Sequence, residues 1–437
     1  MGNPTEKNIA TVINGFNIFF DHIVQKQNLD LNEFVNFMEP IFKTAGYRDT
    51  ANFGGGNILI LTEVSIGDFI VATPAIREIR RIYPYANIIM VVHPRAVEIA
   101  ECCPYVNELI MNPQKHESYN LLEFYKANLG GVPRLLKQKF DICFSFSIHP
   151  HTPLLMYMSG AKIRISSIDD ENMEIFNQSK GLTQYLMKLS THLFPYNTYG
   201  YHRVDRFLSL IENLLCLPII NRKTEVWGTP DDVEFAKKCL NGIEEPIYSL
   251  NMGGIGHKKH YPPEKYARLL EMILAEEPNA TFVILGGGQD DLNSAEIIKT
   301  VAPKIYENNV IDLTDKTNFR QSATILGLCN MYIGNDAGTM HAAAAVSCPV
   351  LTPNCFPADL PISSNDIPQI WYPYGVPSVI VQPEHALPEC KDFHHPFGCM
   401  ANFPHCITQI EPETIFRGFK LLKERIALKI NEPLYIH

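Results

Sequence analysis

The sequence lacks a dense run of basic residues and an uninterrupted apolar stretch of membrane-spanning length. Its 437 residues contain 37 Lys and Arg against 47 Asp and Glu, which gives a formal net charge of −10 at pH 7. An acidic chain without a basic cluster argues against nucleic acid as the main partner. Hydrophobic residues make up 46% of the chain and charged residues 19%, which excludes a disordered, collagenous or coiled-coil protein.

The N-terminal region predicts a protein that is not exported. The uncharged run of residues 8–20 contains Asn14, Gly15 and Asn17 and has no small-residue cleavage site, unlike a secretory signal. The longest uncharged stretch, residues 142–161, contains two His and two Pro and is predicted as a strand followed by a loop. Eleven cysteines are then typical of free thiols in a reducing compartment. We expect a soluble cytoplasmic protein, and contact with the surface of the inner membrane stays open.

Length and hydrophobic patterning predict two domains behind a helical extension. Residues 1–52 carry apolar side chains at helical spacing, which we interpret as a packing extension or as a means of homo-oligomer assembly. Residues 53–222 and 223–410 show short apolar runs alternating with amphipathic segments, which predicts helices covering parallel sheets. Residues 411–437 predict a C-terminal helix that packs back on the N-terminal domain.

The predicted strands direct attention to the loops that follow them. We expect strands near residues 58–61, 88–92 and 142–146 in the first domain, and near residues 247–251, 282–285, 310–313, 331–333 and 350–352 in the second. The Pro-, His- and Cys-rich residues 354–410 are predicted to be irregular. Ligands of α/β domains bind at the carboxyl ends of the strands, so residues just after each strand are candidate site residues.

The first candidate is the Ser65-Ile66-Gly67-Asp68 segment, directly after the first strand. A glycine in this position allows close backbone approach, and a carboxylate at the strand's end is suited to act as a general base. A helix N-cap is the simpler interpretation of Asp68, and the local sequence does not decide between the two.

The second candidate is the loop of residues 251–259, with Asn251, Gly253, Gly254 and a Lys-Lys pair after the first strand of the second domain. Exposed amides of the glycines and the lysine charge suit an anionic ligand such as a diphosphate. The spacing is neither that of a Walker motif nor G-x-G-x-x-G. A flexible surface loop with solvated lysines is the alternative interpretation.

The third candidate is the Gly334-to-Ala345 segment, where a strand ends, a Gly/Asp turn follows and an Ala-rich helix begins. The helix start presents the amides of Gly338, Thr339 and Met340, and free amides together with the helix dipole favour phosphate. A structural turn and cap is the alternative. Residues 285–290 form a further glycine-rich strand exit that suits a polar contact to a ribose or base.

Taken together, these motifs make the sequence similar to glycosyltransferase family 9, the heptosyltransferases that add ADP-activated heptose to lipopolysaccharide core or, in a related branch, to autotransporter proteins. The resemblance covers roughly residues 57–425. Its matching stretches are residues 58–84, 201–217, 248–266, 283–290, 312–317, the Asn-Asp-Ala-Gly-Thr-Met-His helix start and residues 406–413. It implies two facing Rossmann-like domains of the GT-B type and an inverting glycosyl transfer that needs no metal ion and no cofactor beyond the ADP-sugar donor.

The resemblance also assigns roles in the first loop of each domain. The family's Gly-Asp motif maps onto Gly67 and Asp68, which implies Asp68 as the base that deprotonates the acceptor hydroxyl, with Ser65 and Gly67 in the acceptor loop. The family's Lys before an aromatic-Pro turn maps onto Lys259, whose charge is expected to stabilise the departing diphosphate. Inversion by direct displacement needs one base and no nucleophile.

Other family positions differ in this chain. The Asp-Ser/Thr-Gly-x-x-His segment maps onto Asp336, Gly338 and His341, but Ala337 replaces the usual hydroxyl residue and Thr339 is the candidate substitute. These residues are expected near the donor sugar or nucleoside.

The loop after the first strand of the second domain also departs from the family. Gly253 and Gly254 stand where the family often has Thr or Ser, so backbone amides are expected to bind more of the diphosphate. Asn251 adds a side-chain contact, and Asp290 is the acidic residue expected near the nucleoside.

The C-terminal part of the second domain contains a separate candidate. Cys390, Cys399 and Cys406 lie in a segment with several histidines, and thiolates and imidazoles are usual ligands of zinc or iron. The spacing is not that of a CxxC pair, so buried unliganded thiols, a structural metal and a disulfide all stay open.

We therefore expect a glycosyltransferase that acts on a nucleotide sugar and on a glycan or protein acceptor. The alternatives are a non-catalytic nucleotide-binding or scaffold protein, and a nucleotide-sugar epimerase or hydrolase of the same fold. The latter would need further acid/base groups, for which His149, His151 and His341 are the candidates. The sequence does not identify the sugar, the base or the acceptor.

Overall fold

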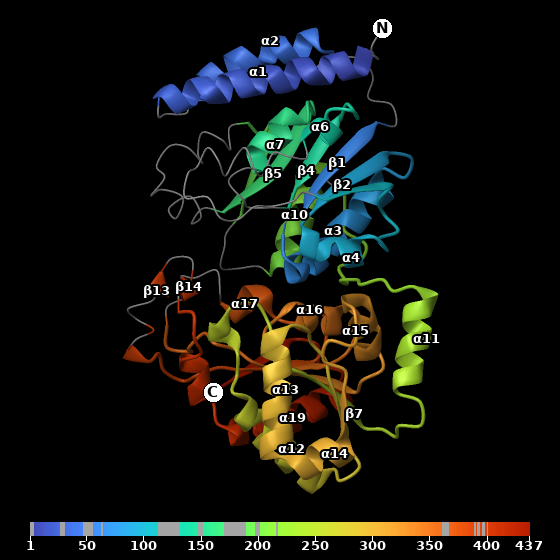
Figure 1. Cartoon of the computed structure of the whole chain (residues 1–437), viewed down its shortest axis with the longest axis vertical. Coiled ribbons are helices and arrows are strands. Elements are labelled where there is room, and N and C mark those ends of the chain that lie inside the picture. The colour runs from blue at the N-terminus through green and yellow to red at the C-terminus, as the bar shows by residue number, and fades with distance from the viewer. Residues whose placement is uncertain are drawn as a thin grey trace. The chain divides into compact units, whose positions relative to one another are not determined.

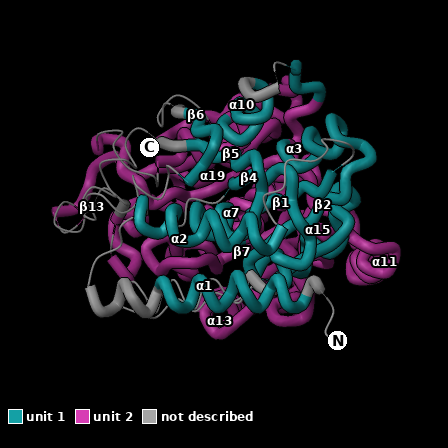
Figure 2. The backbone as a smooth tube through the Cα atoms, turned by 90° about the horizontal axis from the view of Figure 1, so that it is seen from above, with its two compact units in different colours: residues 1–65, 75–198, 206–220 teal, residues 66–74, 199–205, 221–437 magenta. Residues whose placement is uncertain are grey.

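The computed structural model describes most of the chain as two compact units. The described residues are 4–26, 31–46, 56–62, 64–111, 132–146, 152–169, 189–196, 202–215, 217–360, 367–388, 390, 394–395, 398–399 and 401–437. Unit 1 comprises residues 1–65, 75–198 and 206–220, and unit 2 comprises residues 66–74, 199–205 and 221–437 (Figure 2).

Unit 1 is built on a six-stranded parallel sheet with the order β3-β2-β1-β4-β5-β6 (Figure 1). Its strands are β1 (Asn57–Thr62), β2 (Asn87–Val92), β3 (Glu108–Met111), β4 (Ile142–Ser145), β5 (Ile163–Asp169) and β6 (His192–Tyr196). The central strands read as nearly continuous apolar runs because both faces of a parallel sheet are covered. Ile58 pairs with Ile88 on one side and with Ile142 on the other, which confirms the three strands predicted for this domain.

The helices of unit 1 include two at the N-terminus that share its core. α1 (Pro4–Lys26) and α2 (Leu31–Thr44) pack on each other and join the core cluster that contains β1 residues (Figure 1). Phe34 and Phe42 are fully buried, and both rings contact Tyr157 of α7 (Thr152–Met158). Burying each of these rings contributes about 2 kcal/mol. α1 and α2 are therefore part of the core of unit 1, and a role of residues 1–52 in homo-oligomer assembly stays a prediction.

The remaining helices in this half of the chain connect the strands. They are α3 (Ile66–Ile82), the 3₁₀ turn η1 (Pro94–Ala96), α4 (Val97–Ala100), α6 (Val132–Leu135) and α10 (Arg203–Leu215). The first turn of α3 and the first residues of α10 group with unit 2 rather than with the sheet of unit 1.

Unit 2 contains a seven-stranded parallel sheet with the order β15-β12-β11-β10-β7-β8-β9. Its strands are β7 (Ile247–Asn251), β8 (Thr281–Ile284), β9 (Val310–Asp312), β10 (Met331–Gly334), β11 (Val350–Pro353), β12 (Ser378–Val381) and β15 (Pro433–Ile436). The five strands predicted for this domain are confirmed. β12 and β15 extend the sheet beyond them, and β12 lies in the stretch that we expected to be irregular.

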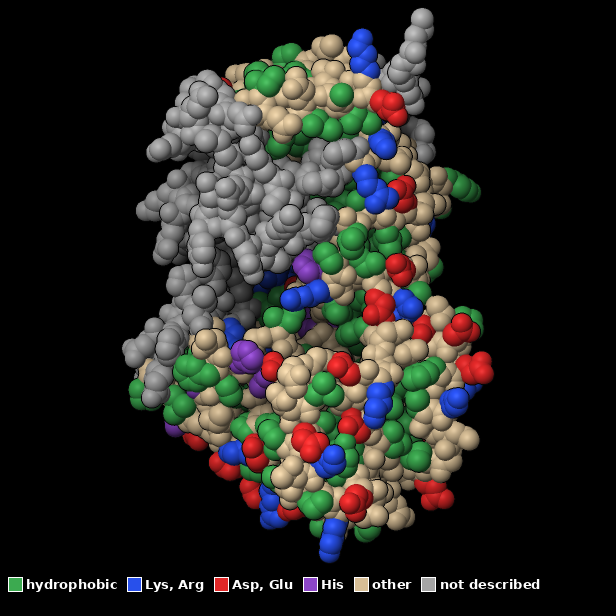
Figure 3. Space-filling view, in the orientation of Figure 1, with side chains coloured by type: hydrophobic (Ala, Val, Ile, Leu, Met, Phe, Trp, Pro, Cys, Tyr) green, Lys and Arg blue, Asp and Glu red, His purple; other side chains and the backbone are tan. Residues whose placement is uncertain are grey.

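The helices of unit 2 connect and cover this sheet. They are α11 (Pro230–Cys239), α12 (Pro263–Glu276), α13 (Gln289–Val301), α14 (Pro303–Asn309), α15 (Phe319–Leu326), α16 (Gly338–Ala345), α17 (Pro368–Trp371) and α19 (Pro412–Leu428), with 3₁₀ turns η3 (His257–Lys259) and η4 (Cys406–Gln409). A short antiparallel ribbon pairs β13 (His394–His395) with β14 (Gly398–Cys399). On the face that carries α12 and α13, acidic and basic side chains are interspersed (Figure 3).

The C-terminal helix belongs to the core of unit 2. Ile415, Phe419 and Leu422 of α19 are buried, and the helix packs mainly on β11, β12 and α12. Its apolar stripe covers β12 within unit 2, and the packing of residues 411–437 on the N-terminal domain stays a prediction. Among the described residues, no helix has the length and apolar character needed to cross a bilayer.

Candidate active site

The turn after β1 places Asp68 in the first turn of α3. The N-cap of this helix is Ser65, whose side chain makes no capping hydrogen bond, and Asp68 is the third helical residue. Asp68 is therefore not the N-cap. A Cβ on Gly67 would lie 2.8 Å from Cδ2 of His341 and 3.6 Å from Cα of Gly338. The absence of a side chain at Gly67 thus lets the first turn of α3 approach the first turn of α16.

Burial and two nearby cations shift the pKa of the Asp68 carboxyl group in opposite directions. Burial raises the pKa of its carboxyl group above the usual value, while the charges of Arg203 and Lys259 partly lower it. The net shift is upward, which makes the Asp68 carboxylate a stronger base than a solvated one.

Lys259 and Asp336 form an ion pair between the loops that follow β7 and β10. Lys259 Nζ lies 2.9 Å from Asp336 Oδ2, and the Nδ2 amide of Asn354 donates to the same oxygen at 3.3 Å. Burial alone would raise the pKa of Asp336, but the charge and hydrogen bond of Lys259, together with His341, hold it below its usual value. Asp336 is therefore ionised and orients the lysine.

His341 is a neutral group in this arrangement. It is 6% exposed, and burial lowers its pKa to about 4, with Asp336 raising and Lys259 lowering that value. Its ring meets the edge of Trp371 at a centroid distance of 6.2 Å. The predicted His341 thus lies beside Gly67 as an uncharged side chain at neutral pH.

The N-terminus of α16 presents backbone amides beside this ion pair. Its N-cap is Ala337, which offers no side-chain acceptor, and Gly338 and Thr339 are the first two helical residues, whose amides lack an acceptor within the helix. The Met340 amide donates instead to the Ala337 carbonyl at 3.0 Å. The arrangement suits an anion at Gly338 and Thr339.

The side chains predicted to contact the donor are partly engaged with each other. Thr339 Oγ1 donates to Asn251 Oδ1 at 2.9 Å, and Asn251 Nδ2 donates to the Leu285 carbonyl at 2.7 Å. These bonds join the ends of β7 and β8 to α16, so both residues order the loops that surround the site.

Close packing with neighbouring loops requires glycine at both positions after β7. A Cβ on Gly254, whose φ is +145°, would lie 3.2 Å from Cβ of Ala337, and a Cβ on Gly253 would overlap the Asp291 carboxylate. The loop after β7 is thereby held against the loops that follow β8 and β10.

Asp290 and Asp291 are adjacent but differ sharply in their exposure to solvent. Asp290 is more than half exposed, and its Oδ2 lies 3.8 Å from Nδ1 of His257. Asp291 is buried and accepts from the Gly287 amide at 2.9 Å, and burial raises its pKa to about 6. The sequence analysis named Asp290 and missed Asp291, whose only signal is its place after the glycine triplet.

Asn335 is a second residue that the sequence analysis missed. It is fully buried, its Oδ1 accepts from the Tyr261 amide at 3.2 Å and from the Tyr266 hydroxyl at 2.9 Å, and its Nδ2 donates to the Met252 carbonyl. Asn335 therefore fixes the loop of Lys259 from both sides. Its position next to Asp336 in the Gly-Asn-Asp turn was the available signal.

Arg203 is a third missed residue. It is 4% exposed, its guanidinium carbon lies 4.7 Å from the ring centroid of Trp371, and its Nε has no hydrogen-bond partner among the described residues. The preceding His202 accepts from the Val204 amide and bonds the Tyr372 carbonyl at 2.9 Å, which anchors the start of α10. The structure thus brings a buried cation to Asp68.

Several predicted features lie elsewhere. His149 and His151 fall outside the described residues. Metal-ligand geometry occurs in two described groups, one of Cys390, His405 and Cys406 and one of His257, His260 and Asp290, of which only the first is fully buried. Neither group contains Asp68 or Lys259.

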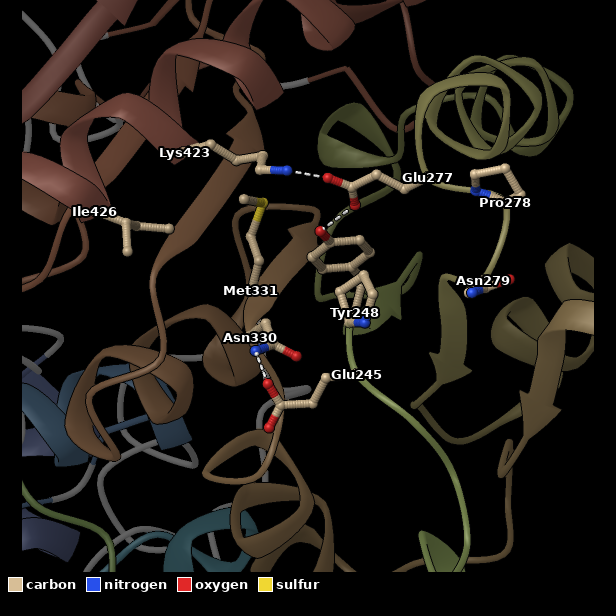
Figure 4. Close-up of a pocket in the computed structure, with 10 residues that line it drawn as sticks. Glu245, Tyr248, Glu277, Pro278, Asn279, Asn330, Met331, Lys423 and Ile426 are labelled. Atoms are coloured by element: carbon tan, nitrogen blue, oxygen red, sulfur yellow. Dashed lines mark hydrogen bonds and ion pairs between the residues drawn. The ribbon is translucent and has the colours of Figure 1, made fainter.

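A cavity of about 600 Å³ lies at the opposite edge of the unit 2 sheet, where β7, β8 and β10 begin (Figure 4). Glu277 occupies its wall, bonded to the Tyr248 hydroxyl and to Lys423. Because ligands of such sheets bind at the carboxyl ends of strands, this cavity is not the candidate active site.

The sequence matches known heptosyltransferases. The model of glycosyltransferase family 9 (heptosyltransferase) matches residues 134–353. Lipooligosaccharide heptosyltransferase 2 of Haemophilus influenzae is 22% identical over 299 residues, which cover 68% of this chain and 82% of that protein. Lipopolysaccharide heptosyltransferase 3 of Escherichia coli is 22% identical over 300 residues, covering 65% and 78%.

Solved structures match over a larger share of the chain. A family 9 glycosyltransferase of Veillonella parvula has a TM-score of 0.62 at 18% identity and covers 86% of this chain and 99% of its own. E. coli ADP-heptose LPS heptosyltransferase II has a TM-score of 0.61 at 15% identity and covers 85% and 99%. These matches confirm the predicted fold class of two parallel α/β domains of the GT-B type.

Proposed function

Because this chain belongs to glycosyltransferase family 9, the heptosyltransferase family, we propose that it transfers a heptose or related sugar with inversion from an ADP-type nucleotide sugar. The acceptor is a hydroxyl group of a saccharide, such as lipopolysaccharide core or another glycan, or of a protein. We propose that the reaction takes place in the cytoplasm. The observation that carries the proposal is the convergence of Asp68, Lys259 and the α16 N-terminus within unit 2.

The proposed reaction is a single displacement. The acceptor oxygen attacks the anomeric carbon while Asp68 takes its proton, and the bond from that carbon to the diphosphate oxygen breaks. The electron pair of the broken bond leaves with the nucleoside diphosphate. The acceptor's proton ends on Asp68, so one base is sufficient for the step.

The departing diphosphate needs positive charge that is already in place. Lys259 supplies a full charge held by Asp336, and the amides of Gly338 and Thr339 supply the positive end of a helix dipole. We therefore propose transfer without a metal ion at the diphosphate. Added Mg²⁺ or Mn²⁺ is expected to leave the initial rate unchanged.

The opposite pKa shifts of the two carboxylates indicate which one acts as the base and which one helps to bind the diphosphate. Burial raises the pKa of Asp68, whereas Lys259 holds that of Asp336 low. Pairs of titratable groups whose pKa values are shifted in opposite directions are typical of sites where one group exchanges a proton and the other stays charged. Asp68 is assigned the proton transfer, and Asp336 the orientation of Lys259.

The test is transfer by the full-length chain, with ADP-heptose as donor and heptose-deficient lipopolysaccharide core or an autotransporter peptide as acceptor. Mass spectrometry detects the glycosylated product. Asp68→Asn is expected to lower the rate of product formation about 10³-fold and to leave ADP binding intact. The exposed Asp231→Asn on α11 serves as the matched control. Product formation by Asp68→Asn at the wild-type rate would refute the role of Asp68.

A donor incubation without acceptor separates the transferase from its alternatives. A transferase leaves the nucleotide sugar intact apart from slow hydrolysis, while an epimerase or hydrolase converts it at the full rate. A scaffold protein binds the nucleotide and converts nothing with or without acceptor.

A further inference from the structure

Arg203 is a buried cation that has no anionic partner in the part of the chain that the structure describes. It is the first residue of α10 and is 4% exposed, and its Nε makes no hydrogen bond to a described residue. Its guanidinium also forms no ion pair with a described carboxylate. Burial of an unpaired charge is strongly destabilising, so buried charges in proteins are generally paired or bind a ligand.

The two cations near Asp68 differ in this respect. Lys259 Nζ lies 2.9 Å from Asp336 Oδ2, whereas the guanidinium of Arg203 lies over the ring of Trp371, with its carbon 4.7 Å from the ring centroid. A guanidinium that stacks by its face keeps the N–H donors at its edge available for other partners. Such a planar fork of donors recognises carboxylate and phosphate groups through two parallel hydrogen bonds.

Trp371 connects Arg203 to the residues around the proposed base. The Trp371 and His341 rings meet edge to face at a centroid distance of 6.2 Å, and His341 in turn packs on Gly67, the residue before Asp68. Among the effects that lower the pKa of Asp68, the charge of Arg203 is the largest. All five residues belong to unit 2. Arg203 therefore lies close to Asp68 without forming an ion pair with it.

We propose that Arg203, stacked on Trp371, binds an anionic oxygen group of a substrate, a carboxylate or a phosphate, beside the hydroxyl that Asp68 deprotonates. The inference rests on the proposed function, which offers two sources of such a group, the diphosphate of the donor and an acidic group of the acceptor. In both cases the N–H groups of Arg203 donate to the anion's oxygens. The bound anion provides the partner that Arg203 lacks in the ligand-free protein.

The stability of the ligand-free protein distinguishes this binding role from a structural one. Arg203→Met replaces the unpaired cation by an apolar side chain, so without ligand the variant is expected to melt at the wild-type temperature or above it. On addition of the bound anion it is expected to gain less in melting temperature than the wild type. A lower melting temperature with an undiminished gain from every anion would show a structural role and overturn the inference.

The donor arm of the test measures the affinities of the full-length chain for ADP, inorganic pyrophosphate and adenosine by calorimetry. If the donor diphosphate is the anion, Arg203→Met is expected to bind ADP and pyrophosphate about tenfold more weakly or worse, and adenosine as the wild type does. Arg203→Lys keeps the charge but not the planar fork and is expected to lie between the two. Arg268→Met, which removes an exposed arginine paired with Glu271 on α12, is the matched control.

The acceptor arm measures binding of the core saccharide of heptose-deficient lipopolysaccharide by calorimetry, which needs no turnover. The saccharide is compared with a form whose phosphates are removed and whose carboxyl groups are esterified. If the acceptor supplies the anion, the wild type is expected to bind the untreated form about tenfold more tightly, and Arg203→Met to bind both forms alike. ADP affinity then stays unchanged in Arg203→Met.

Unchanged affinity of Arg203→Met for ADP, pyrophosphate and the untreated saccharide overturns the inference and leaves the proposed function standing. An equal loss in Arg268→Met also overturns it, because the effect would then not be specific to the buried arginine. A wild type that binds pyrophosphate through Arg203 but neither binds nor converts ADP-heptose contradicts the proposed function and supports the anion site. If Arg203→Met does not fold, Arg203→Gln and Arg203→Lys give the same decision, since they differ in charge.

Discussion

Asp68 and Asp336 are two carboxylates of unit 2 whose surroundings shift their pKa values in opposite directions. Asp336 accepts hydrogen bonds from Lys259 and Asn354, and its pKa is lowered despite burial. Asp68 faces two cations electrostatically, but burial dominates and its pKa is raised. The two carboxylates thus differ in that Lys259 hydrogen bonds to Asp336 and joins His341 and Lys258 in lowering its pKa, whereas the charges of Arg203 and Lys259 offset only part of the effect of burial on Asp68.

The strongest test of this contrast replaces each carboxylate by its amide. Asp68→Asn removes the proposed base and is expected to lower kcat about 10³-fold, within the usual range for general base catalysis, while ADP affinity stays near that of the wild type. Asp336→Asn is expected to weaken ADP binding, because Lys259 loses its orienting partner. Steady-state kinetics and calorimetry on both variants check the assignment, and equal loss of kcat in the two would contradict it.

Lys259→Met removes the cation that lowers the pKa of Asp336 and that is proposed to bind the diphosphate. Loss of a charged hydrogen-bond donor is expected to weaken ADP binding about 10- to 100-fold. The variant also leaves Asp336 buried without its main cation, which is expected to destabilise the fold by about 2 kcal/mol at neutral pH.

The pH dependence of Lys259→Met follows from the sign of the shift. In the wild type the folded pKa of Asp336 lies below its unfolded value, so its stabilising contribution is present above the unfolded pKa and is lost as pH falls through the folded pKa. In the variant burial dominates and the folded pKa rises, so the deficit is largest at neutral pH and shrinks as pH falls. Urea unfolding between pH 4 and 7 measures this, and a deficit that is constant with pH contradicts it.

Gly67→Ala tests the packing that brings Asp68 to His341. The added Cβ would lie 2.8 Å from the His341 ring, so the first turn of α3 must move. We expect kcat to fall about tenfold through misplacement of Asp68. In the His341→Ala background the same change should cost less, because the obstructing ring is gone. Equal losses in both backgrounds would show that the two residues do not interact.

Arg203→Met sharpens the comparison by removing one of the charges that lower the pKa of Asp68. In the proposed mechanism transfer requires ionised Asp68, so kcat/KM is expected to fall as pH drops through the pKa of this group. Without Arg203 that pKa rises, and the acidic limb of the plot of kcat/KM against pH is expected to move to higher pH by about half a pH unit to one pH unit. Arg203→Lys keeps the charge and should stay near the wild-type profile, whereas a purely structural role would lower rates without moving the limb.

Much of the fold could be predicted because apolar runs and helix starts are local signals. Residues 58–61 and 247–251 read as buried parallel strands and form β1 and β7. β15 was missed because Pro433 to Ile436 follows a helix as a short edge strand whose residues are only partly buried. Its place is fixed by pairing with β12, which no local pattern expresses.

The candidate site was predictable where chemistry follows a strand directly. Asp68, Lys259, Asp336 and His341 all lie just after strand ends, and the structure brings them together in one unit. Arg203 could not be found in this way, since it comes from the start of a helix whose charged residues read as a solvated face. Asn335 and Asp291 were missed because their importance lies in burial beneath loops, which depends on packing between distant segments.

The grouping of residues 66–74 with the second unit has a consequence for recombination between family members. A chimaera joined after residue 220 would take its base from one parent and its donor loops from the other. The two residues of each close contact, Gly67 with His341 and Ile66 with Gly338, would then come from different parents. If the proposed site residues bind the donor, we therefore expect that an exchange of donor specificity between family members requires the first turn of α3 together with the C-terminal half.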